Sequence, residues 1–409
     1  MNQTAPATDF PEDAEPQPRP PSRARAALLR RLADVVCLPS SRVNAFERAM
    51  TADLLVEILR EAGPSERIRV AKRLSCLGEV PATLLQLLLR DHIEVAEPLL
   101  VECASLSDRD LIDCARMATL EHRRLIAIRR GVSEVVADAL IEFEETVVIE
   151  CLLRNTQAKL SHSGVEAIVA NSRGDGRLVP TLLKRPEVRP SQAYVLFWWA
   201  DAEARRTILQ RFAVSREVLQ DAVGDIFSLA AQEGWQDPLA RKALQFIERR
   251  QRNRAAIEKS PFDSLEDAVA AAQGGMSRET AEEISYLSGL KPMTGAKIFT
   301  DDGGEALAIL CKATGLPRAA VRALWRGLRR PETDAEGVLT PALDRAITTY
   351  DMIAVDRAQT VLRYWNWSLS SAMTPSLMRA IREGDEDAVD EYSVPQRAAM
   401  LALSKELSR

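Results

Sequence analysis

An aliphatic residue followed by a helix-starting residue recurs six times in the first half of the chain. The pairs are Val80-Pro81, Leu106-Ser107, Val132-Ser133, Leu160-Ser161, Val188-Arg189 (with Pro190 next) and Val214-Ser215. Successive pairs lie 26, 26, 28, 28 and 26 residues apart. A nearly constant period in this range indicates an array of structural repeats.

Each period contains two apolar segments at helical spacing, separated by a short polar break. Residues 81–89 and 94–102, for example, flank Arg90-Asp91-His92. Serine and proline are common where helices begin, which places a helix start after each aliphatic residue. One pair of short helices cannot cover its own apolar face, so stacked pairs are expected to share a continuous core. The same pattern predicts helix pairs at 53–61 with 65–74, 107–117 with 121–128, 133–143 with 145–153, 163–170 with 177–184 and 191–199 with 202–211.

The strict pattern fades after Val214. Residues 236–258 are expected to form one long helix with a basic end at Arg249, Arg250, Arg252 and Arg254. A related period then returns, because Gly289 and Gly315 are 26 residues apart and each precedes a leucine and a proline. Glycine after a helix and proline at the start of the next one predict two variant helix pairs. A helix from 340 to about 366 should follow a loop at 330–340, and Pro375 and Pro395 mark two later helix starts.

These patterns predict an all-α protein, an α-solenoid of short two-helix repeats with a helical C-terminal region. The expected parts are a disordered tail (1–22), the repeat solenoid (23–225), a long basic helix connector (226–262), variant helix pairs (263–330) and a C-terminal helical cap or separate module (331–409). Six prolines and scarce large apolar residues in 1–22 favour disorder there and argue against a signal peptide.

One stretch carries a family resemblance. Leu89-Leu-Arg-Asp-His-Ile-Glu-Val-Ala-Glu-Pro-Leu-Leu100, followed by Leu106-Ser-Asp-Arg-Asp-Leu-Ile112, resembles the bacterial domain-of-unknown-function family 2336. Its units are similar to leucine-rich-repeat-variant and HEAT-like repeats. The resemblance covers roughly residues 27–330 and rests on the repeat pattern. It implies an all-helical solenoid and no particular reaction.

The composition argues against some classes of partner but does not identify one. Apolar residues make up 46% of the chain, enough for a sizeable core, and the formal net charge of -5 disfavours general binding to nucleic acid or anionic membrane. No apolar run approaches the roughly 20 residues of a membrane helix. The six cysteines show no CxxC spacing, so we expect reduced thiols and a cytoplasmic protein.

Candidate catalytic and metal-binding groups are sparse. His92, His122 and His162 lack a second histidine or cysteine at ligand spacing, and the default expectation for His122 is a solvated position at a helix start, with phosphorylation as the less favoured alternative. Carboxylate runs such as Asp301-Asp302 read as surface positions, and Gly303-Gly304 reads as a turn. We therefore expect no catalytic residues, no cofactor, no metal site and no enzyme activity.

Two segments remain as candidates for partner binding. Trp198 and Trp199 lie in the densest aromatic cluster, and although most of it should be core, one tryptophan could face a partner. Residues 304–330 have a helix-turn-helix rhythm in which Arg318, Arg322 and Arg326 could meet phosphates. The expected function is recognition of a protein partner in bacterial regulation or scaffolding. The alternative is a DNA-binding regulator that uses 304–330 and the basic segment 249–254. The oligomeric state and the binding face stay open.

Overall fold

The computed structural model describes residues 23–247, 252 and 254–371. Over these residues the chain forms 23 α-helices and one 3-10 helix, with no strand beyond an isolated bridge between Thr333 and Leu339. The predicted all-α class is confirmed. The chain divides into two compact units, one ending at Arg129 and the other beginning at Arg130.

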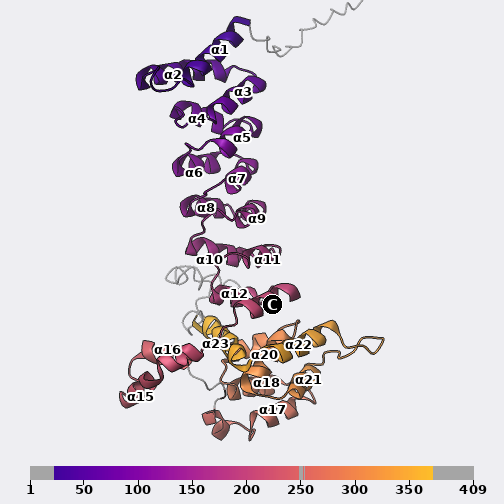
Figure 1. Cartoon of the computed structure of the whole chain (residues 1–409). Coiled ribbons are helices and arrows are strands. Elements are labelled where there is room, and N and C mark those ends of the chain that lie inside the picture. The colour runs from indigo at the N-terminus through magenta and orange to yellow at the C-terminus, as the bar shows by residue number, and fades with distance from the viewer. Residues whose placement is uncertain (1–22, 248–251, 253, 372–409) are drawn as a thin grey trace, which may run out of the picture. The chain divides into compact units, whose positions relative to one another are not determined.

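The first unit is built from short helices, and α3 to α7 lie close to the predicted places (Figure 1). Within it, α2 packs on α4, and α3, α5 and α7 pack in succession, so helices at equivalent positions contact each other as in a repeat stack. The helices are α1 (Arg23–Val36), α2 (Ala45–Arg60), α3 (Pro64–Leu74), α4 (Ala82–Leu89), α5 (Ile93–Glu102), α6 (Asp108–Met117) and α7 (Leu120–Ala127).

Helix α2 begins eight residues before the predicted start at 53. Asn44 caps it: its side chain accepts the Glu47 N–H at 2.8 Å, and the Glu47 carboxylate accepts the Asn44 N–H at 3.0 Å. This reciprocal capping box satisfies two backbone donors that would otherwise lack partners, so the helix can begin there.

The second unit opens with three more pairs. Helix α10 packs on α8 and on α12, and α11 packs on α9. Ser133 and Ser161 cap α8 and α10, while the preceding Val132 and Leu160 are buried. At these two signatures the recurring pair is a core anchor followed by a helix cap. The helices are α8 (Glu134–Ile141), α9 (Thr146–Arg154), α10 (His162–Asn171), α11 (Leu178–Leu182), α12 (Pro190–Leu196) and α13 (Ala202–Arg211).

At the last signature, Val214-Ser215, Val214 is exposed and Arg216 occupies the N-cap of the next helix. The α14–α16 segment follows: α14 (Glu217–Ala222), α15 (Gly224–Gln232) and α16 (Pro238–Ile247). The prediction of one helix over 236–258 was wrong, because α16 ends at Ile247, residue 252 is a bend, and a 3-10 helix, η1 (Arg254–Lys259), comes next.

Arg252 explains the bend. Its Nε donates to the Thr314 carbonyl at 2.6 Å and its Nη2 pairs with Glu266 at 2.6 Å. This basic residue is therefore held against the helices that follow it in the chain. Arg249 and Arg250 lie outside the described residues, as does the predicted tail at 1–22.

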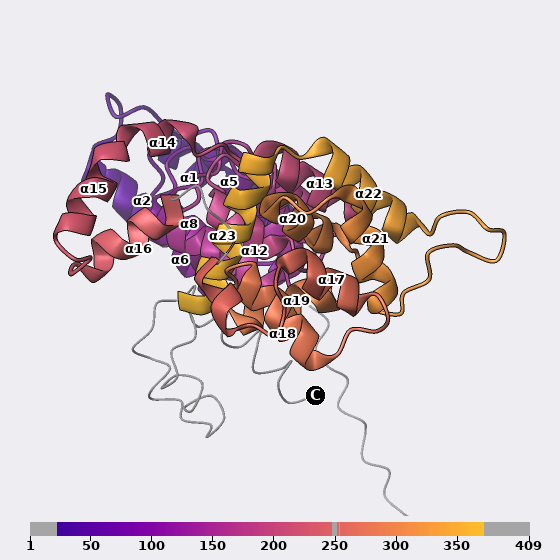
Figure 2. The same ribbon diagram turned by 90° about the horizontal axis from the view of Figure 1, so that it is seen from below.

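The remaining helices surround α20, in which nine of ten residues are buried. Helices α19, α21, α22 and α23 all contact it, and Figure 2 shows α23 between this group and the α14–α16 segment. Gly289 and Gly315 have φ of +68° and +74°, the left-handed backbone expected after a helix, which confirms the two variant pairs. The helices are α17 (Leu265–Ala272), α18 (Arg278–Leu287), α19 (Pro292–Thr300), α20 (Glu305–Thr314), α21 (Arg318–Gly327), α22 (Pro341–Met352) and α23 (Val355–Ser371).

The prediction of a single helix over 340–366 was wrong, because the helix stops at Ile353. The break lets both α22 and α23 pack on α20, and α23 also packs on α12 and α19. Residues 341–371 are therefore part of this unit and not a separate module. The predicted helix starts at Pro375 and Pro395 lie outside the described residues.

Candidate functional site

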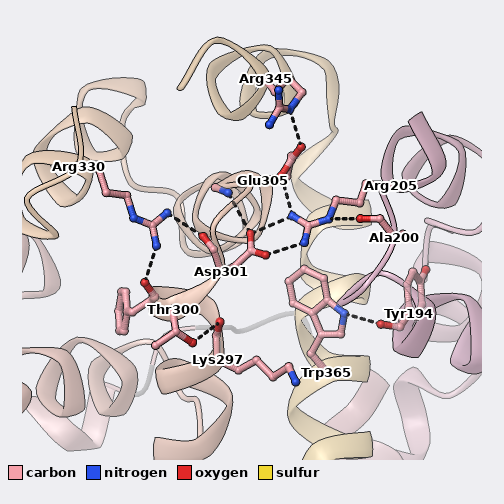
Figure 3. A network of polar contacts seen from close by, with 12 residues as sticks. Tyr194, Ala200, Arg205, Lys297, Thr300, Asp301, Glu305, Arg330, Arg345 and Trp365 are labelled. Atoms are coloured by element: carbon pink, nitrogen blue, oxygen red, sulfur yellow. Dashed lines mark hydrogen bonds and ion pairs between the residues drawn. The ribbon is translucent and has the colours of Figure 1, made fainter. Parts of the chain in front are cut away.

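A buried ion network joins the last repeat helix, α13, to the start of α20 (Figure 3). Arg205 Nη2 lies 2.7 Å from Asp301 Oδ1, and its Nη1 lies 2.8 Å from Glu305 Oε2. All three side chains are less than 10% exposed. Buried carboxylates need such pairing because the desolvation of an isolated charge is costly.

Backbone groups complete the network. Arg205 Nε donates to the Ala200 carbonyl at 3.1 Å, and the Gly304 N–H donates to Asp301 Oδ2 at 2.9 Å. Gly304 has φ of +81°, and a Cβ there would lie 2.3 Å from the Trp325 ring. Glycine is therefore required at this turn, which aims the start of α20 at Arg205.

Electrostatics keep Arg205 charged. Burial alone would lower its pKa, but hydrogen bonds and ion pairs with Asp301 and Glu305 outweigh burial and raise the pKa above its ordinary value. Arg345 on α22 reaches Glu305 from the other side, at 3.2 Å, and is 40% exposed. The network thus extends from the core to the surface.

A groove of about 500 Å³ opens where Arg345 emerges. Its lining is mostly apolar, with Leu209 from α13 and Met352 and Ile353 from the end of α22, and Glu305 also contributes. Arg206 and Arg357 stand exposed at its edge, and no ion pair is found for either among the described residues. Glu203 and Asp344 are exposed in the same lining, so the groove combines apolar walls with charges of both signs. The other lining residues are Ala202, Glu203, Gln210, Asp344, Thr348, Thr349 and Ala354.

The predicted tryptophans lie elsewhere in the same unit and are half-buried. Trp198 stacks near Trp365, with ring centroids 4.7 Å apart, and Lys297 lies over its ring. Trp199 Nε1 donates to Ser172 Oγ at 3.0 Å. Both side chains are engaged in internal contacts, and neither lines the groove. Their proposed partner role stays a prediction.

The arginines of the helix-turn-helix-like segment are also engaged in part. Arg318 pairs with Asp351 at 3.2 Å, and Arg326 pairs with Glu332. Arg322 is half-buried on the same helix, α21. The first helix of this segment, α20, is the buried centre of the unit, so the segment's first helix is enclosed by other helices.

His122 is buried, so the expectation of a solvated position was wrong. Its Nε2–H donates to the Asp91 carbonyl at 3.1 Å, and its Nδ1 lies 2.9 Å from the Thr119 hydroxyl oxygen. Burial lowers the pKa of His122, with an opposing contribution from the Asp91 hydrogen bond. The imidazole therefore serves as a neutral link between two helix pairs.

Nucleophilic and metal chemistry finds little support among the described residues. Burial raises the pKa of Cys114 to about 11 and that of Cys311 to about 12, which keeps both thiols protonated. In that part of the chain, no three His, Cys, Asp or Glu side chains come together as metal ligands.

Sequence reasoning missed the centre of this site. Asp301 was read as part of a surface run and is buried, whereas Gly303-Gly304 does form the expected turn. Arg205 and Glu305 were not singled out, because their pairing spans 100 residues of sequence and no local pattern signals it. The one local hint was the Gly303-Gly304 pair followed by Glu305 at the head of an otherwise apolar run.

Comparison with known proteins places the chain in a family. A family model described as an uncharacterised protein conserved in bacteria (DUF2336) matches residues 95–363, well over half of the chain. No curated protein and no solved structure matches. None of the described helices is long and apolar enough to cross a membrane. The matched range contains α13, α20 and α22, so the ion network and the groove fall within it. The chain belongs to the bacterial DUF2336 family.

Proposed function

We propose that this is a cytoplasmic, non-catalytic helical-repeat protein that binds a protein partner in the groove between α13 and α22. A regulatory or scaffolding role follows from binding without chemistry. The observation that carries the proposal is the groove itself, with mostly apolar walls and two exposed arginines at its edge. HEAT-like and leucine-rich-repeat-variant arrays present surfaces of this kind.

The lining suggests the chemistry of the partner. Leu209 and Met352 form an apolar surface that can contact one or two side chains of a partner. Methionine is flexible and adapts its shape to different partners. Arg206 and Arg357 can pair with carboxylates, and arginine is favoured at interface anchors. Glu203 and Asp344 can likewise pair with basic side chains, so a helical segment with an apolar stripe bordered by charges of both signs fits this groove.

Site-specific photocrosslinking in the native cell tests the proposal. A photoreactive amino acid replaces Met352 in the groove or, as a matched control, the exposed Met117 of the first unit. We expect a defined protein adduct only from position 352. Both Leu209→Glu and Arg206→Glu should reduce that adduct about tenfold. Arg109→Glu, at an exposed position of α6, should not.

Two outcomes would reject the groove. An adduct that survives both groove variants, with unchanged thermal melting, would mean that the partner sits elsewhere. Absence of any adduct at 352, with a strong one at Trp198 or Trp199, would transfer the binding role to the aromatic cluster.

DNA binding is the alternative and has weaker support. Asp351 and Glu332 already neutralise two of the arginines that would meet phosphates. Retention on DNA at low salt, lost in the triple variant Arg318→Ala, Arg322→Ala and Arg326→Ala, would favour it because phosphate contacts are salt-dependent. No retention at low salt would end it.

A further inference from the structure

The α14–α16 segment has almost no core of its own. Among its described side chains only Ala230 and Leu244 are buried, and α14 has no buried residue. Large apolar side chains face solvent instead, with Val218 82% and Leu239 80% exposed, together with Leu219, Ile226 and Leu229. Exposed apolar surface at this density marks a site that another element covers.

We propose that residues 395–409 of this same chain dock on the α14–α16 segment. The path of the chain is the first support. Helix α23, the last described element, is already seated there: the Tyr364 and Phe246 rings lie 4.8 Å apart, and Arg216 Nη2 donates to Gln359 Oε1 at 3.2 Å. The chain continues beyond Ser371, and an extended residue spans about 3.3 Å, so residues 372–394 can bridge any distance across the segment.

The sequence of residues 395–409 supplies the second support. Met400, Leu403 and Leu407 recur at i, i+3 and i+7, the spacing of one helical face, after a helix-starting Pro395. Such a stripe could cover Val218, Leu239 and their apolar neighbours.

Charge complementarity is the third support. Residues 217–247 contain five acidic and two basic residues, whereas residues 395–409 contain three basic residues and one acidic residue. The acidic side chains of the segment, Glu217, Asp221, Asp225, Glu233 and Asp237, are all exposed. Opposite charges around an apolar stripe favour one docked arrangement over others.

Hydrogen exchange of the full-length chain, followed by mass spectrometry at low protein concentration, tests the docking. Leu403→Glu puts a charge on the apolar stripe, and we expect amides of residues 217–247 to exchange about tenfold faster, the ratio that corresponds to 1.4 kcal/mol. The control Ser404→Glu adds the same charge beside the stripe and should leave exchange unchanged.

A change on the other side of the contact completes the test. Leu239→Glu should speed the exchange of residues 395–409, and Gln232→Glu, also exposed and on α15, should not. Because Leu239 is 80% exposed, this substitution does not threaten the folding of the unit.

Equal exchange in all four variants would overturn the proposal. Protection of residues 217–247 that grows with protein concentration, together with a dimer mass by light scattering, would overturn it in favour of a second copy on this surface. The docking stands independently of partner binding in the α13–α22 groove, so either can fail alone.

Discussion

The repeat helices α2–α13 and the C-terminal helices α17–α23 are held together by interactions of different range. In the repeats, an arginine near the end of a pair donates to carbonyls at the end of the previous pair: Arg129 to Leu100 at 2.7 Å, and Arg185 to Ala158 at 2.7 Å. Arg211 contacts the Leu183 carbonyl in the same way. The C-terminal helices depend in addition on contacts such as Arg205–Asp301, 96 residues apart.

This difference shows two ways of satisfying buried polar groups. The repeat arginines meet carbonyls at helix ends or in the loop just beyond, and carbonyls at helix ends lack partners within their own helix and carry partial negative charge. Arg330 likewise donates to the Phe299 and Asp301 carbonyls, at 2.8 and 2.7 Å. The variant pairs therefore use the same arginine–carbonyl contact as the repeats. Arg205 instead pairs with two fully charged carboxylates, and Arg345 shares one of them. Removing a repeat arginine should therefore reduce the free energy of unfolding less than removing Arg205 from the ion network.

The largest expected effect is the loss of Arg205, the cation at the centre of the ion network. Arg205→Met leaves Asp301 and Glu305 buried without their main partner, and we expect a loss of about 3–5 kcal/mol in the free energy of unfolding. Urea denaturation measures it. Arg206→Met, the exposed neighbour, is the matched control and should change stability by less than about 0.5 kcal/mol. A loss at Arg205 no larger than the control would mean that the network adds no net stability.

Removing a repeat arginine should cost less. Arg185→Met leaves the Ala158 carbonyl without its arginine donor, removes one of two donors to the Asn155 carbonyl and breaks the ion pair with Glu187. We expect a loss of about 1–3 kcal/mol in the same urea experiment. Arg177→Met removes an exposed arginine paired only within its own turn to Asp175, and serves as the control. If Arg185→Met cost as much as Arg205→Met, the distinction between local capping and the long-range network would disappear.

The same distinction explains what the sequence could predict. Helix pairs followed from Ser133, Ser161 and similar caps, because caps and core anchors act over a few residues. The repeat arginines could also have been found, since Arg129, Arg185 and Arg211 keep the spacing of the array. The break at Ile353 and the bend at Arg252 could not, because both depend on tertiary packing around α20.

The groove belongs to the unpredictable part for the same reason. Arg206 and Met352 come from helices far apart in the sequence, and each alone reads as an ordinary surface residue. Only the packing of α13, α20 and α22 brings them together. The candidate site therefore required the structure, whereas the fold class did not.

The smallest expected effect concerns His122, which links α7 to the Asp91 turn as a neutral group. Because burial lowers its pKa in the folded chain, the unfolded chain binds the proton more readily. The stability that neutral His122 contributes is therefore present above the unfolded pKa of about 6.5 and is lost as the pH falls below it. Urea midpoints between pH 7.5 and 5 should decline more steeply for the unmodified chain than for His122→Gln, which cannot titrate. Identical slopes for the unmodified chain and His122→Gln would show that the repeat helices, like the ion network, tolerate a buried charge.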